Sequence, residues 1–216
     1  MNLDLAALAV PQLFRDPRMF DSAKSWKAAG FAIVRASKHR MLVAKHASVN
    51  GYLFKKYPNS VPLNEQIAKY TQRVEGAQKL REFVTAKGLQ RISVPQKQLC
   101  SLPPQFSPLG GVASYILVVE EMPILNEKAS KKAHEHIDET TLRELCTVFF
   151  AFERLDFTAQ NAPFTKTGTI AFIDTAHANY RNPSNRKYLT YAKRYLSGRR
   201  WKLAEKIFEE LEARIN

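Results

Sequence analysis

The chain has 216 residues, of which 45% are hydrophobic and 25% charged, proportions that fit one globular domain or a small domain with an appendage. Lys and Arg outnumber Asp and Glu by 33 to 20, so the formal net charge is +13 and the surface should attract phosphates, nucleotides or acidic partners. This composition excludes a fibrous repeat and a wholly disordered chain, and no apolar run is long enough to cross a bilayer. Two cysteines and the lack of a signal-peptide pattern favour a cytoplasmic location, or delivery into a host cytosol.

The first predicted elements are three short strands that follow an N-terminal extension over residues 1–29. Runs of β-favouring residues occupy positions 31–36, 41–47 and 52–57, with turn residues between them. Asn50-Gly51 lies between the second and third runs, and both residue types tolerate the positive φ of a tight hairpin. We therefore expect an antiparallel meander.

A long helix and two further strands are predicted next. From residue 64 to Gly88, apolar side chains recur at the three-and-four spacing of one buried helix face, and the glycine is typical of a helix end. Residues 91–99 favour a strand in which Pro95 indicates an edge or a bulge. Residues 114–119 form a mainly apolar strand that ends at Glu120.

The second half of the chain is predicted to be mainly helical. Residues 139–152 carry an apolar stripe at helical spacing, and so does the last of two expected terminal helices. A hairpin is expected over residues 164–173, with Gly168 at its turn. Strands followed by helices, with one long helix inserted after the third strand, indicate an α+β fold.

The most informative segment holds Asp156, Asn161 and Asp174. Four residues separate the first two, and the predicted hairpin follows them and ends at Asp174. This pattern resembles the catalytic and metal-binding loops of the protein kinase superfamily. The resemblance implies that Asp156 reaches the acceptor hydroxyl, while Asn161 and Asp174 hold the Mg²⁺ that bridges the phosphates of ATP.

Residues from the first half complete the resemblance. Glu120 and Met122 follow the apolar strand, where kinases bind adenine through backbone groups of a hinge. The family also pairs a strand lysine with a helical glutamate, and Glu75 lies where that glutamate is expected. Lys55, 20 residues before Glu75 on the third predicted strand, is our choice for the lysine that contacts the ATP phosphates. Lys45, 30 residues before Glu75 on the second strand, is the alternative.

The chain departs from the kinase pattern at several places. The loop over residues 37–40 has no glycine, so Lys38 or Arg40 would have to supply by charge what a Gly-rich loop supplies through backbone amides. Thr158 stands where the family has a lysine, and Thr-Ala follows Asp174 in place of Phe-Gly. Only 42 residues follow Asp174, and they contain no A-P-E motif. The resemblance therefore implies a minimal, divergent member of the kinase type.

The expected architecture is bilobal. Residues 30–122 would form a small antiparallel-sheet N-lobe with one long helix and the hinge, and residues 123–216 a truncated helical C-lobe with basic terminal helices. The preferred function is an ATP-dependent, Mg²⁺-assisted phosphotransferase acting on an unknown hydroxyl acceptor. The alternative is a pseudokinase that uses the same fold as a binding or scaffold module, because several catalytic elements are missing. A basic nucleic-acid-binding protein is the second alternative.

The positive charge is concentrated near the C-terminus. No acidic residue occurs from Thr175 through Ala204, and eight basic residues do: Arg181, Arg186, Lys187, Lys193, Arg194, Arg199, Arg200 and Lys202. We expect an acidic or phosphorylated substrate or partner to bind over residues 180–202. Nucleic acid is less favoured, because no helix-turn-helix, zinc-finger or RNP pattern accompanies the charge.

Other reactive side chains do not form a convincing site. His134 and His136 are two residues apart in a helical stretch and do not share a face, so they and Asp138 are not expected to bind a metal ion. Cys146 lies on an apolar helix stripe and is expected to be a small core residue.

Overall fold

The computed structural model describes residues 13–14, 22–36, 41–102, 114–153, 155, 158–180, 193, 196 and 198–214. The chain divides into two compact units that interleave along the sequence. The sheet unit comprises Met1–Val74 and Gln96–Glu121, and the helical unit comprises Glu75–Pro95 and Met122–Asn216. Among the described helices, none is both long and apolar enough to cross a membrane.

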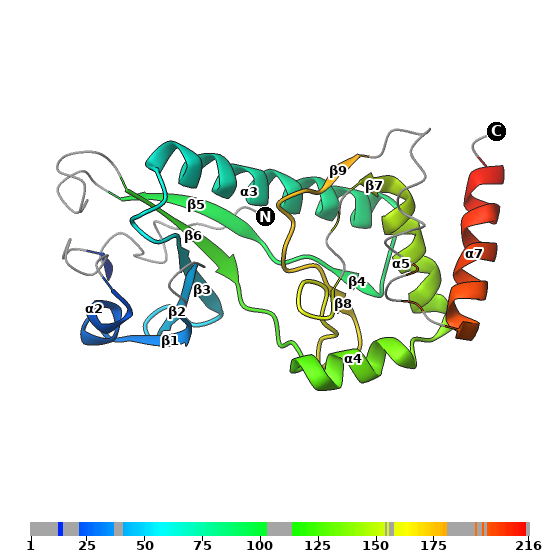
Figure 1. Cartoon of the computed structure of the whole chain (residues 1–216), viewed down its shortest axis with the longest axis horizontal. Coiled ribbons are helices and arrows are strands. Elements are labelled where there is room, and N and C mark those ends of the chain that lie inside the picture. Colours follow the sequence, from blue (N-terminus) through cyan, green and yellow to red (C-terminus); the bar gives the residue numbers. More distant parts are fainter. Residues whose placement is uncertain are drawn as a thin grey trace. The chain divides into compact units, whose positions relative to one another are not determined.

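The sheet unit is built on five antiparallel strands in the order β1-β2-β3-β6-β5 (Figure 1). Its elements are α2 (Ala23–Ala28), β1 (Phe31–Arg35), β2 (Leu42–His46), β3 (Tyr52–Lys56), the first half of α3 (Leu63–Ala86), β5 (Lys97–Leu102) and β6 (Ser114–Glu120). The predicted meander is confirmed, with each of its three strands within one residue of the expected bounds. Gly51 has a φ of 83°, which is the conformation that the turn between β2 and β3 requires.

The two faces of this sheet bury different apolar clusters. On one face, Phe54 of β3 packs against Phe31 of β1 with their ring planes at 87°, and Trp26 of α2 joins the same cluster. On the other face, Tyr70 of α3 is fully buried with Leu117 of β6. Its hydroxyl accepts the Tyr57 amide at 2.8 Å, and burial raises the pKa of the phenol. Successive side chains of β3 and β6 therefore point alternately toward the aromatic cluster and toward α3, so both faces of the sheet are covered.

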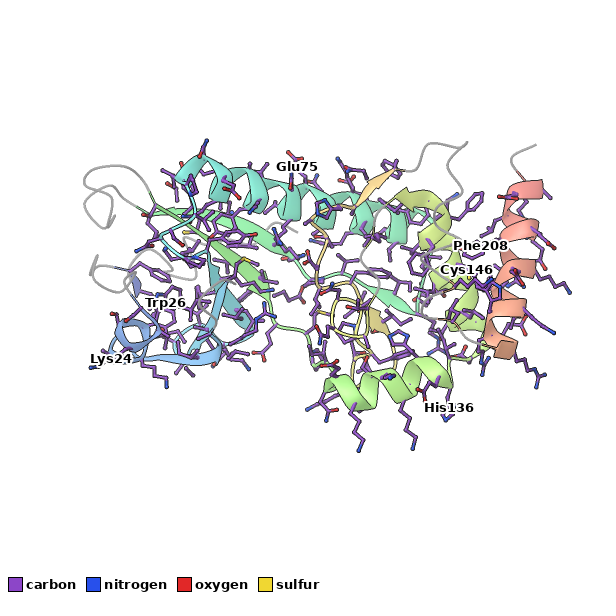
Figure 2. The ribbon with its side chains drawn as sticks, in the orientation of Figure 1. Lys24, Trp26, Glu75, His136, Cys146 and Phe208 are labelled. Carbon is purple, nitrogen blue, oxygen red and sulfur yellow. The ribbon has the colours of Figure 1, made fainter. Side chains whose placement is uncertain are left out.

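The helical unit collects the remaining elements around one core. They are the second half of α3, β4 (Ile92–Ser93), α4 (Glu127–Glu135), α5 (Glu139–Ala151), β7 (Phe152–Glu153), β8 (Ile170–Ala171), β9 (Asn179–Tyr180) and α7 (Gly198–Ala213). Figure 2 shows Cys146 of α5 and Phe208 of α7 on the facing sides of the two helices, and both belong to the core cluster. The prediction that Cys146 is a core residue is thus confirmed.

Helix α3 ends as its sequence predicts. The Leu89 amide donates to the Val84 carbonyl at 3.0 Å and the Gly88 amide to the Thr85 carbonyl at 3.1 Å, the two hydrogen bonds of a Schellman motif. Gly88 has the positive φ of 62° that this motif needs.

The single strand predicted over residues 91–99 is wrong. The segment forms two strands, β4 and β5, on either side of Pro95. Proline has no amide to donate to a ladder, and the chain changes from the helical unit to the sheet unit directly after it. β4 then pairs in parallel with β8, while β5 pairs antiparallel with β6.

The predicted α+β class is confirmed. A five-stranded antiparallel sheet with helices, divided into a sheet-bearing and a mainly helical unit, is consistent with the bilobal kinase-like plan. The observed units differ in extent from the expected lobes, because the second half of α3 and β4 belong to the helical unit.

Candidate functional site

Asn161 and Asp174, both predicted to hold Mg²⁺, come together within the helical unit. The Asn161 carbonyl accepts the Ile173 amide at 2.9 Å and the Asp174 amide at 3.4 Å. The Asp174 carboxylate accepts the Ala176 amide at 3.2 Å, which holds its own side chain at the start of a turn. Both motif residues are half-buried, so their oxygen atoms are neither in the core nor fully solvated.

Thr158 organises the loop that carries Asn161. Its carbonyl accepts the Asn161 amide at 2.9 Å and the Ala162 amide at 2.8 Å, and its hydroxyl lies 3.1 Å from the Asn161 nitrogen. Thr158 therefore closes a turn, and this turn fixes the backbone of Asn161.

Gly76 on α3 lets the Asp174 segment approach the helix. A Cβ atom at this position would lie 1.9 Å from the Thr175 carbonyl oxygen and 3.2 Å from the Cβ of Ala178. No side chain could be accommodated without moving the backbone of one of the two segments. The absence of a side chain at Gly76 thus sets where the residue after Asp174 lies.

Short strands hold the motif segment at both ends. β7, which precedes Asp156 in the sequence, pairs antiparallel with β9, which follows Asp174, through Phe152↔Tyr180 and Glu153↔Asn179. The Phe152 and Tyr180 rings stack with centroids 4.8 Å apart. The predicted hairpin is present between them, with Gly168 at a φ of 85° and the Thr165 amide donating to the Thr169 carbonyl at 2.7 Å.

Helix α4 supports the same loop through two polar side chains that sequence reasoning missed. His134 is 8% exposed, and its Nε2 lies 2.9 Å from the Ala162 carbonyl. A carbonyl can only accept, so Nε2 carries the proton. The Ser130 hydroxyl accepts the Phe164 amide at 3.0 Å, and the His134 ring packs edge-on against the Phe164 ring. Burial lowers the pKa of His134, which keeps the imidazole neutral at pH 7.

The sheet unit carries the two candidate lysines. Lys45 of β2 forms an ion pair with Glu121, which directly follows β6. Lys55 of β3 lies opposite Leu117 of β6, is half-buried, and shares its sheet face with Leu53. Glu75 is exposed on α3 (Figure 2) and belongs to the other unit, so its pairing with Lys55 stays a prediction.

The predicted hinge residues already use part of their backbone. The Glu120 amide donates to the Gln96 carbonyl at 2.9 Å, and the Glu120 carboxylate accepts the Gln96 amide at the same distance. The Met122 carbonyl accepts the Ile124 amide at 2.8 Å. Binding of adenine by Glu120 and Met122 stays a prediction, and it would fall to their remaining backbone atoms.

Several predicted site residues lie outside the described residues: Asp156, Lys38, Arg40 and most of the basic stretch from 180 to 202. Their roles stay predictions. Within the described ranges, no three side chains of His, Cys, Asp or Glu gather in a way that could hold a metal ion.

The minor candidates have structural roles. Asp138 caps α5 by accepting the Thr141 amide at 2.9 Å and the Thr141 hydroxyl at 2.7 Å, and these hydrogen bonds lower the pKa of its carboxyl. His136 is exposed at the end of α4, whereas His134 is buried (Figure 2 labels His136). Burial raises the pKa of the Cys100 thiol to about 11 and that of Cys146 to about 12, so neither is a thiolate nucleophile at pH 7.

The Asn161–Asp174 pair has the chemistry of a hard-cation site. An amide oxygen and a carboxylate are ligands that Mg²⁺ accepts, and this ion normally completes its shell with phosphate and water. The residues present therefore fit Mg²⁺ better than zinc, whose protein sites are built mainly from Cys and His.

Comparison with known proteins adds little to this geometry. No family model and no curated protein sequence matches the chain. Among solved structures, the chain is similar to one described as the high-resolution (2.2 Å) crystal structure of WbdD, at 12% sequence identity and a TM-score of 0.40. The match covers 85% of this chain and 45% of the WbdD chain, so the present chain spans less than half the length of that protein. Similarity at this level does not carry an activity from one protein to the other.

Proposed function

We propose that the chain is an ATP-dependent phosphotransferase of the kinase type that transfers a phosphoryl group to a hydroxyl acceptor. The observation that carries the proposal is the double hydrogen bond from the Ile173 and Asp174 amides to the Asn161 carbonyl. It holds the backbones of Asn161 and Asp174 side by side, although they lie 13 residues apart in the sequence, and their order and spacing match a kinase metal site.

In this proposal each residue has a limited task. Asn161 and Asp174 hold Mg²⁺, which when bound offsets the negative charge of the nucleotide phosphates. Lys55 adds a second positive charge for those phosphates, and Asp156 orients the acceptor hydroxyl and takes its proton. Catalysis of this kind consists mainly of positioning and electrostatic stabilisation, so it needs no side chain with an unusual pKa.

The test compares thermal unfolding of the wild type and of Asp174→Asn, with and without ATP and Mg²⁺. Asparagine keeps the oxygen that accepts the Ala176 amide and removes only the charge, so the variant should fold normally. ATP at about 100 times its dissociation constant should stabilise the wild type by ~2.7 kcal/mol, which raises the unfolding midpoint by roughly 5–10 °C. We expect the Mg²⁺-dependent part of this shift, and transfer of labelled γ-phosphate, to be lost in Asp174→Asn.

Asp138→Asn is the matched control. It makes the same chemical change in a helix cap, where the asparagine oxygen can still accept the Thr141 amide. This variant should keep the full ATP shift. Equal shifts in Asp174→Asn and the wild type would overturn the assignment of Asp174.

A nucleotide-binding pseudokinase is the second candidate, and Thr158 favours it. The residue closes a turn around the Asn161 amide and offers no cation to the transferred phosphoryl group. Under this alternative, ATP and Mg²⁺ stabilise the wild type but no phosphate transfer or ATP hydrolysis follows. The same titration, combined with a turnover assay, distinguishes the two functions.

A further inference from the structure

The helical unit has a basic groove whose described lining includes none of the residues assigned to ATP and Mg²⁺. It lies between the start of α5 and the first two turns of α7 and has a volume of about 540 Å³. Among the described residues, its lining consists of Glu139, Arg199, Arg200, Lys202 and Leu203. A volume of this size suits a small molecule, since ligand pockets commonly enclose about 300–1,000 Å³.

The positive charge of this groove is not compensated within the described part of the chain. Glu139 is its one described carboxylate, and it already lies 3.7 Å from Arg143 on the next turn of α5. Arg143 also binds Glu210 of α7 at 2.5 Å. In the same described ranges, neither arginine of the groove nor Lys202 takes part in an ion pair. Within the described residues, the groove therefore presents three cations without a paired carboxylate, and such cations attract anionic ligands.

The distribution of charged residues along α7 does not stabilise the helix. A helix is stabilised by acidic residues in its first turn and basic residues in its last turn, because of its dipole. Helix α7 has the opposite order: its first turn holds Arg199 and Arg200 without an acidic residue, and its last turn has no basic residue. Residues placed against the stability of their own element are more readily explained by a ligand than by folding.

We propose that this groove binds a small molecule with several phosphate groups. Arg199 and Arg200 can each bind one phosphate group through two parallel N–H···O hydrogen bonds, and Lys202 adds a further positive charge beside them. A compact ligand with two or more phosphates fills the volume and neutralises three cations at once. A nucleic acid strand would need an extended basic surface along several nucleotides, whereas this groove lies between the ends of two helices. Binding does not depend on the proposed phosphotransfer, since none of the groove residues belongs to the motif around Asp174.

The experiment is calorimetric titration of the full chain with inositol hexakisphosphate, at an ionic strength of about 0.15 M, where surface charges more than about 8 Å apart are largely screened. We expect saturable binding by the wild type. In Arg199→Ala/Arg200→Ala the affinity should fall roughly 100-fold, because hydrogen bonds between charged partners contribute about tenfold each. Inorganic phosphate, with one group to offer, should bind far more weakly than the probe.

The matched control is Lys206→Ala/Arg214→Ala, which removes the same net charge from α7 and the residue directly after it, outside the described lining of the groove. It should change the affinity by no more than about threefold, as expected for screened charges at a distance. Asp174→Asn should bind the probe like the wild type, which separates this proposal from the phosphotransferase.

Three outcomes would overturn the proposal. The wild type could show no saturable binding of inositol hexakisphosphate. The two double variants could lose affinity equally, which would mean that net charge alone attracts the probe. A 20-nucleotide single strand could displace the probe at a lower concentration than inositol hexakisphosphate itself, which would assign the groove to nucleic acid.

Discussion

At the scale of single residues, Gly76 controls the Asn161–Asp174 site through an absent side chain. An exposed helical glycine can usually be replaced by alanine with a gain of roughly 0.5–1 kcal/mol. In Gly76→Ala the new methyl group would meet the Thr175 carbonyl at 1.9 Å, so the segment carrying Asp174 must shift. We expect a net loss of about 1–3 kcal/mol, the usual cost of overpacking, measured by urea unfolding. The Mg²⁺-dependent ATP shift should also disappear.

Gly88→Ala is the control for this substitution. Gly88 has a positive φ of 62°, and a Cβ there meets nothing within 4 Å. Its replacement should cost ~1–2 kcal/mol through backbone strain alone and leave the ATP shift intact. A Gly76→Ala variant as stable as the wild type, with an unchanged ATP shift, would refute the role assigned to Gly76.

His134 makes the support of the Asn161 loop dependent on pH. Burial lowers the pKa of His134 in the folded protein below the ordinary value of 6.5. Between these two pKa values the imidazole is protonated in the unfolded chain and neutral in the folded chain. The contribution of His134 to the free energy of unfolding is therefore fully present above pH 6.5, the ordinary pKa, and is lost as the pH falls toward the lower pKa of the folded state. His134→Gln keeps an N–H that can reach the Ala162 carbonyl and cannot be protonated.

The measurement is the unfolding midpoint between pH 7.5 and about 5, a range above the ordinary carboxyl pKa values. We expect the midpoint of the wild type to fall more steeply with acidity than that of His134→Gln. Asp138 does not confuse the comparison, since hydrogen bonds to Thr141 lower its pKa and it titrates in more acidic solution. Parallel pH curves for the two proteins would show that His134 does not couple the loop to protonation.

At the scale of elements, the sequence predicted the helices and strands whose bounds depend on neighbouring residues in the chain. Alternating residues and Asn50-Gly51 determine the first three strands, and the Schellman glycine Gly88 determines the end of α3. The bounds of helix α4 were not predicted, because its buried residues are polar, Ser130 and His134, so apolar periodicity does not reveal them. An N-cap at Asn126 was the available signal.

The candidate site divides in the same way. Motif spacing was sufficient to predict that Asn161 and Asp174 lie close together along the backbone, because a short hairpin returns the chain to its start. Their role as Mg²⁺ ligands stays a prediction. Gly76 and His134 could not be found from the sequence, since each acts on a segment that is distant along the chain. The pairing of β4 with β8 is likewise non-local. The sequence therefore did not reveal that the strand is interrupted at Pro95 or that the chain passes from one unit to the other there.

At the scale of the whole molecule, the net charge of +13 is the dominant property that no single contact explains. Like charges repel more strongly in the compact state than in the expanded chain, so such an excess destabilises the folded protein. The repulsion weakens with salt, because the screening length falls from about 10 Å at 0.1 M to about 3 Å at 1 M. We therefore expect the unfolding midpoint to rise by several degrees when NaCl increases over this range.

The described ion pairs would act in the opposite direction, and their geometry decides which effect is larger. Lys45–Glu121 and Arg143–Glu210 are partly exposed, and pairs of this kind contribute only ~0–1 kcal/mol each before screening. Ion pairs of this kind among the described residues are too weak to offset the mutual repulsion of a surplus of 13 cations. A midpoint that falls with added NaCl would mean that these pairs, rather than the net charge, dominate the electrostatics of the fold. In Arg199→Ala/Arg200→Ala the rise with salt should be smaller, since two of the charges that benefit from screening are gone.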